Sequence, residues 1–104
     1  MSHVIESSGE IEIISLVSRT KRFEPGDRIQ LIFKPIDAQT PPYKLRIVSP
    51  TGKGIVDTII RDLPTGEPQS AAPFEFSPAV AGVYVVEIRS MKTSAYGKAD
   101  LKID

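Results

Sequence analysis

Residues able to support catalysis are scarce in this chain. It contains one His, His3, and no Cys. A serine-hydrolase triad or a histidine general base would therefore have to use His3. Residues 1–9, which end in Ser-Ser-Gly, are predicted to be a flexible N-terminal tail, and a tail cannot hold a base about 3 Å from a nucleophile. We expect no catalytic residue and no enzyme activity.

The sequence gives little support for a metal site or for catalysis by paired carboxylates. Without Cys, and with a single His, a zinc site lacks its usual ligands. The carboxylates do not form the Asp-x-Asp-x-Asp loop of a calcium site; they are Asp27, Asp57, Asp62, Glu67 and Asp100. A glycosidase pair of Asp57 with Asp62 or Glu67 cannot be argued from chain spacing, because the reaction depends on spatial separation. We expect neither a metal nor a cofactor.

Two short stretches raise the question of phosphate binding. Arg19-Thr20-Lys21-Arg22 is either an anion patch or a solvated loop, and so short a basic run favours the loop. The segment 49–54 contains Gly-Lys-Gly, but Ile47 and Gly54 stand where a Walker motif needs Gly and Ser or Thr. A hairpin turn is predicted there. Thirteen basic and thirteen acidic residues give no net charge, which argues against a nucleic-acid-binding domain.

The elements that would position any site are all strands. No window sustains the apolar spacing of a helix. The segment 76–90 begins as a turn and then alternates, with Tyr84, Val86 and Ile88 on one face. Six further segments have strand composition: 10–18, 28–34, 43–48, 55–61, 74–76 and 98–104. The apolar parity of 10–18 switches at Ile14, which predicts a bulge or a strand that changes sheets.

The chain is long enough for one domain. We predict an all-β fold, a single seven-stranded antiparallel immunoglobulin-like β-sandwich over residues 10–104. No apolar run is long enough for a transmembrane segment, and no signal peptide is visible. A full chain would be cytoplasmic. An excised domain would be extracytoplasmic or cell-surface, with membrane or surface attachment through missing flanking sequence.

Three stretches carry a family resemblance: Phe23-Glu24-Pro25-Gly26-Asp27 through Leu31, Leu45 through Lys53, and Gly82-Val83-Tyr84-Val85-Val86. Together they resemble the immunoglobulin-like domains of the α2-macroglobulin family and, more loosely, fibronectin type III and bacterial surface modules. The resemblance implies a sandwich with a scaffold or binding role, and a Tyr84 hydroxyl bonded to nearby backbone as in a tyrosine corner. It carries over no catalytic residue. The Cys pair and Trp of antibody domains are absent.

A candidate interaction surface follows from the outward positions of the predicted strands. Four apolar residues point away from the expected core: Ile32, Val48, Val83 and Val85. If they share one sheet face, they form a patch that calls for a partner; otherwise a loop or the N-terminal segment covers them. An exposed edge strand is another docking route, and Lys98 and Lys102 would protect the last strand. The loop 62–73 is either a binding loop or a crossover.

We therefore expect a non-enzymatic immunoglobulin-like module that mediates protein–protein interaction or assembly, as part of a cell-surface or extracytoplasmic structure. Its partner would be another protein or a second copy. The alternative is a carbohydrate- or ligand-binding accessory module of a larger protein. That alternative requires exposed aromatic rings, and only Tyr43 and Tyr96 lack a better core assignment.

Overall fold

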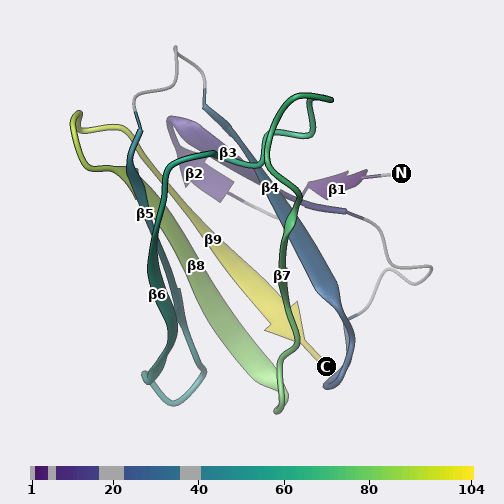
Figure 1. The fold of residues 1–104 in the computed structure, drawn as a ribbon. Coiled ribbons are helices and arrows are strands. Elements are labelled where there is room, and N and C mark those ends of the chain that lie inside the picture. Colours follow the sequence, from purple (N-terminus) through teal and green to yellow (C-terminus); the bar gives the residue numbers. More distant parts are fainter. Residues whose placement is uncertain (1, 5–6, 17–22, 36–40) are drawn as a thin grey trace.

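The computed structural model describes residues 2–4, 7–16, 23–35 and 41–104, and the side chains of 9–15, 23–35 and 41–104. Every regular element in these ranges is a strand (Figure 1). The described residues form nine strands: β1 (Ser2–Val4), β2 (Ser7–Gly9), β3 (Ile11–Leu16), β4 (Ile29–Pro35), β5 (Tyr43–Val48), β6 (Gly54–Ile60), β7 (Phe74–Phe76), β8 (Gly82–Ser90) and β9 (Tyr96–Ile103).

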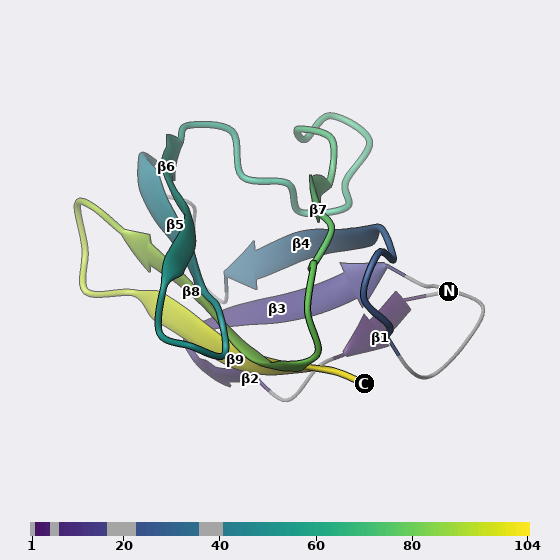
Figure 2. The same ribbon diagram turned by 90° about the horizontal axis from the view of Figure 1, so that it is seen from below.

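The strands form two antiparallel sheets that face each other (Figure 2). One has the order β1-β3-β4-β7 and the other has the order β2-β9-β8-β5-β6. The seven predicted strands are β3 to β9. Three of them lie in the first sheet and four in the second. The predicted all-β class and the two antiparallel sheets are therefore confirmed.

The two remaining strands lie in the segment that the sequence predicts as a tail. β1 pairs with β3, and β2 pairs with β9 through Gly9 opposite Gly97. Both strands are only three residues long and pair through backbone groups. Such short segments have no recognisable side-chain alternation, so the sequence does not predict them as strands. The chain passes from one sheet at β2 to the other at β3. The predicted change of sheet occurs, but just before Ile11 instead of at Ile14.

The core follows the predicted alternation. In the five-stranded sheet the inward residues are buried on β5 (Tyr43, Leu45, Ile47), β8 (Tyr84, Val86, Ile88) and β9 (Ala99, Leu101, Ile103). β4 contributes Ile29, Leu31 and Phe33 from the opposite layer. The intervening residues of the five-stranded sheet face away from this core, so its outer face carries the polar and charged side chains.

The loop 62–73 crosses from the five-stranded sheet to the four-stranded one (Figure 2). Leu63, Pro64 and Thr65 are buried, and the Phe33 N–H donates to the Pro64 carbonyl oxygen at 2.7 Å. That bond lies beyond the register in which β7 pairs with β4. The loop therefore bonds to β4 beyond the point where β7 stops pairing with it. This supports the prediction that the loop 62–73 is a crossover between the sheets.

Candidate interaction surfaces

The structure separates the four predicted surface residues. Val48 and Val85 lie opposite each other on the outer face of the five-stranded sheet, and Val83 follows on the same face of β8. Ile32 lies in the other sheet and is only 4% exposed. A Cβ built on Gly66 would lie 3.1 Å from Ile32 Cδ1, so the loop 62–73 covers this residue. The expectation of one shared face is wrong for Ile32, because alternation does not reveal which sheet a strand joins.

The outer face of the five-stranded sheet changes character along its strands. The pairing registers place its residues in rows across neighbouring strands. The first row is apolar and acidic: Val48, Val85 and Asp100. The second row alternates in charge: Asp57, Arg46, Glu87 and Lys98. The third row contains an apolar residue, two cations and an aromatic residue: Ile59, Lys44, Arg89 and Tyr96. Cations therefore gather toward the β8–β9 turn.

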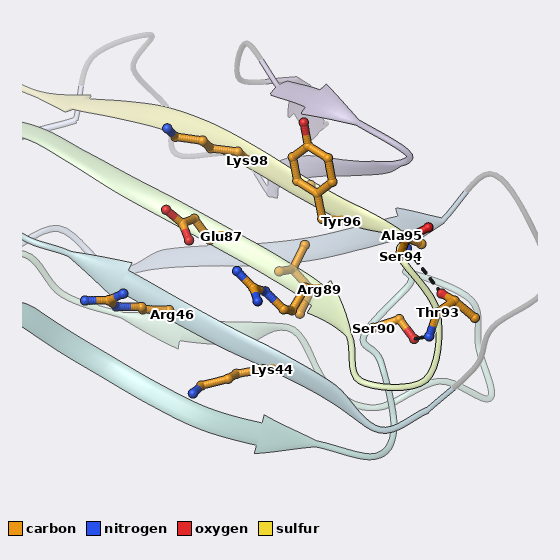
Figure 3. Close-up of a pocket in the computed structure, with 12 residues that line it drawn as sticks. Lys44, Arg46, Glu87, Arg89, Ser90, Thr93, Ser94, Ala95, Tyr96 and Lys98 are labelled. Carbon is orange, nitrogen blue, oxygen red and sulfur yellow. Dashed lines mark hydrogen bonds between the residues drawn. The ribbon is translucent and has the colours of Figure 1, made fainter.

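A groove of about 580 Å³ lies at this cationic end (Figure 3). We call it the basic groove; its principal side chains are Lys44, Arg46, Arg89 and Tyr96, and the β8–β9 turn, residues 91–95, forms one wall. Glu87 and Lys98 also line it. The basic residues come from the neighbouring strands β5, β8 and β9 (Figure 3).

Like charges oppose each other in this groove. Lys44 and Arg89 are direct cross-strand partners, an arrangement that destabilises a sheet. Lys44 Nζ is offset by Asp57 Oδ1 at 3.6 Å. Among the described residues, Arg89 has no carboxylate within salt-bridge distance. The groove thus combines an unneutralised guanidinium with a neighbouring ammonium.

The wall of the groove is held by the buried Ser90 side chain. Ser90 Oγ accepts hydrogen bonds from the N–H groups of Lys92 at 3.2 Å and Thr93 at 3.1 Å. The Ser90 N–H donates to the Ala95 carbonyl oxygen at 2.9 Å. These bonds fix the turn next to the cationic row, so the groove is a formed feature of the fold.

Tyr43 and Tyr96, the two tyrosines that the sequence does not assign to the core, have different positions in the structure. Tyr43 is 2% exposed and belongs to the core, so it cannot contact a ligand. Tyr96 is 48% exposed and lies opposite Arg89 in the groove. The sequence alone did not reveal this groove, because alternating charges look like a solvated face until the strand register aligns them.

The second surface is the edge formed by β6. Of the four sheet edges among the described strands, those of β1, β2 and β7 are three residues long, whereas β6 has seven. Ile55 and Ile59 on β6 are 44% and 56% exposed. Asp57 is its one charged residue. The predicted protection of an open edge does not apply to Lys98, because β2 pairs with β9 from Gly97 to Ala99.

The core is also incompletely covered beside β6. Val56 and Ile60 of β6, and Phe74 and Phe76 of β7, are only partly buried although they pack against the core. β6 and β7 are the edges of different sheets on the same side of the sandwich (Figure 2). Partly exposed apolar side chains therefore lie on both of these edge strands, in addition to Ile55 and Ile59.

Three further candidate positions named from the sequence are the segment 49–54, the basic run 19–22 and His3. In the segment 49–54, the Gly52 N–H donates to the Ser49 carbonyl oxygen at 2.9 Å, which confirms the hairpin turn. Residues 19–22 lie outside the described residues, and His3 is described only through the backbone of β1. Within the described ranges, no three His, Asp or Glu side chains cluster as metal ligands.

The described part of the chain contains no helix with the length and hydropathy needed to cross a membrane. We compared the chain with protein-family models, with curated proteins and with solved structures, and none of the three comparisons gave a match.

Proposed function

We propose that this chain is a non-enzymatic, immunoglobulin-like module that assembles by pairing its β6 edge with the β6 edge of a second copy. The observation that carries the proposal is the long apolar edge of β6. Natural sheets commonly shorten, charge or cover their edges, and an exposed apolar edge is a template for another strand.

The immunoglobulin-like assignment is supported by the strand order. In this assignment β3, β4 and β7 correspond to strands A, B and E, and β9, β8 and β5 correspond to G, F and C. β6 lies beside β5 instead of completing the first sheet, a variation compatible with related sandwiches. The Tyr84 hydroxyl donates to the Val80 carbonyl oxygen at 2.9 Å. This bond resembles the tyrosine corner of strand F and so supports the assignment of β8 to that strand.

The register of the proposed pair follows from alternation and charge. Facing residues of an antiparallel pair lie on the same side of the sheet, so outward residues must meet outward residues to keep both cores intact. Centring on Ile59 satisfies this condition. It places Ile59 against Ile59, and each Asp57 against the exposed Arg61 that directly follows β6. Centring on Thr58 also meets the condition, but it sets Asp57 against Ile59 and Arg61 against Ile55, so no opposite charges pair. Centring on Asp57 would oppose two carboxylates, which is unfavourable.

The first test is the mass of the protein by light scattering over a concentration series. We expect a species of twice the 11.4 kDa of one chain. Ile59→Lys would place two ammonium groups at the symmetry axis and weaken the dimer by roughly tenfold or more, because like charges that face each other repel. Val80→Lys is the matched control, since Val80 is 53% exposed but lies outside β6.

A charge exchange tests the register itself. Arg61→Asp alone would oppose two carboxylates and weaken the dimer. Combining it with Asp57→Arg restores opposite charges across the interface, and the dimer should recover. A strict monomer at every concentration, or an Ile59→Lys variant as dimeric as the parent, would overturn the proposal.

A further inference from the structure

We propose that the basic groove is a binding site for acidic oligosaccharides, in which Arg89 and Lys44 hold a sugar carboxylate and Tyr96 packs against the adjoining ring. This site adjoins the β6 edge, because Lys44 lies opposite Ile59 and pairs with Asp57, but ligand binding there goes beyond the assembly function. It rests on the cross-strand row that joins Lys44, Arg89 and Tyr96.

The charges of the groove select an anion. Lys44, Arg46, Arg89 and Lys98 line it together with one carboxylate, that of Glu87. Lys44 and Arg89 are direct cross-strand partners. Asp57 offsets the charge of Lys44 at 3.6 Å, so a bound carboxylate would mainly neutralise Arg89 and reduce what remains of the repulsion between the two cations. A guanidinium also matches the planar shape of a carboxylate through two parallel hydrogen bonds.

The remaining lining favours a sugar over a simple anion. The half-exposed Tyr96 ring lies on β9 opposite Arg89, and aromatic rings supply apolar contact area with a polar hydroxyl at one end. The hydroxyl-bearing residues Thr93 and Ser94 line the adjacent wall. A volume of about 580 Å³ lies within the range of small-molecule sites. A sugar acid supplies a carboxylate, ring hydroxyls and an apolar ring face in one unit, whereas a peptide made only of glutamates supplies no ring for Tyr96.

The experiment is a titration of the ¹⁵N-labelled protein followed by amide chemical shifts. The probe is tetragalacturonate, with maltotetraose as the neutral sugar and tetraglutamate and inorganic sulfate as anions without a sugar ring. We expect tetragalacturonate to shift amides of β5, β8, β9 and their connecting turn, and to bind more tightly than all three comparison ligands.

Two variants test the assigned roles. Arg89→Gln removes the carboxylate partner and should lower the affinity by roughly tenfold or more, whereas Tyr96→Ala should lower it by roughly fivefold. Lys53→Gln removes one exposed charge from the β5–β6 turn and should leave the affinity unchanged. Arg89→Gln should also raise the thermal midpoint of the free protein, because it removes the repulsion with Lys44.

Three outcomes would overturn the proposal. The first is no saturable shift with tetragalacturonate. The second is equal binding of tetraglutamate or sulfate, which would make the groove a general anion patch. The third is an unchanged affinity for tetragalacturonate in Tyr96→Ala, which would show that Tyr96 does not pack against a sugar ring.

Discussion

The Tyr84 hydroxyl connects strand β8 to the turn that precedes it by bonding both backbone groups of Val80. It donates to the Val80 carbonyl oxygen at 2.9 Å and accepts from the Val80 N–H at 3.3 Å. The Tyr84 ring is buried and lies 6.4 Å, centroid to centroid, from the ring of Phe76 on β7. One side chain therefore links the two sheets and fixes the chain reversal between them.

Tyr84→Phe tests this connection because it removes the hydroxyl and keeps the buried ring. We expect the free energy of unfolding to fall by about 1–2 kcal/mol, since two backbone groups lose a partner and water replaces it only in part. Urea unfolding measures the change. Tyr96→Phe is the control, because Tyr96 is about half exposed and its hydroxyl should matter by less than about 0.5 kcal/mol. Equal effects of the two variants would contradict the structural role of the Tyr84 hydroxyl.

Gly97 lies where β3 passes directly beneath β9. A Cβ at this position would collide with the backbone carbonyl oxygen of Ile11. Because the obstacle is main chain, Gly97→Ala must displace a strand. We expect a loss of about 1–3 kcal/mol or more in the free energy of unfolding.

Gly54 provides the matched control for this substitution, because a Cβ there meets nothing within 4 Å. Gly54→Ala should change stability by no more than about 0.5 kcal/mol. Thermal and urea unfolding of both variants give the comparison. A Gly97→Ala protein as stable as Gly54→Ala would mean that β2 and β3 do not cross β9 as described.

The loop 62–73 is anchored by Leu63, which is 2% exposed and belongs to the core cluster. Leu63→Ala should cost about 2–4 kcal/mol through lost burial and the cavity left behind. Ile59→Ala, on the exposed edge of β6, should alter the stability of the monomer by much less. A small effect of Leu63→Ala would contradict the anchoring role of Leu63 and favour the alternative of a binding loop.

Much of this fold can be predicted from side-chain alternation. Lys98 to Ile103 alternates cleanly, and its apolar residues are buried as expected. The turn around Gly26 was also predictable, because Pro-Gly-Asp is a recognised turn sequence. In the structure the Asp27 N–H donates to the Glu24 carbonyl oxygen at 3.1 Å, and Gly26 has a φ of 92°.

The candidate surfaces were less predictable because they depend on which strands become neighbours. Ile32 and Val83 both point outward by alternation, yet one is covered and the other is 45% exposed. The opposition of Lys44 and Arg89 appears only when β5 and β8 are placed in register. Likewise, nothing in the residues 54–60 themselves shows that β6 is an edge strand.

A single introduced cysteine tests the predicted β6 pairing most directly, because the parent chain contains none. In the register centred on Ile59, the two Ile59 Cα atoms would be about 4.5–5.5 Å apart, within the range that a disulfide spans. Ile59→Cys should therefore form a covalent dimer rapidly under mild oxidation, seen by non-reducing electrophoresis. Val83→Cys is the control, since Val83 is 45% exposed but lies on β8, away from the edge. Equal crosslinking of both variants at low protein concentration would show random collision and contradict the proposed interface.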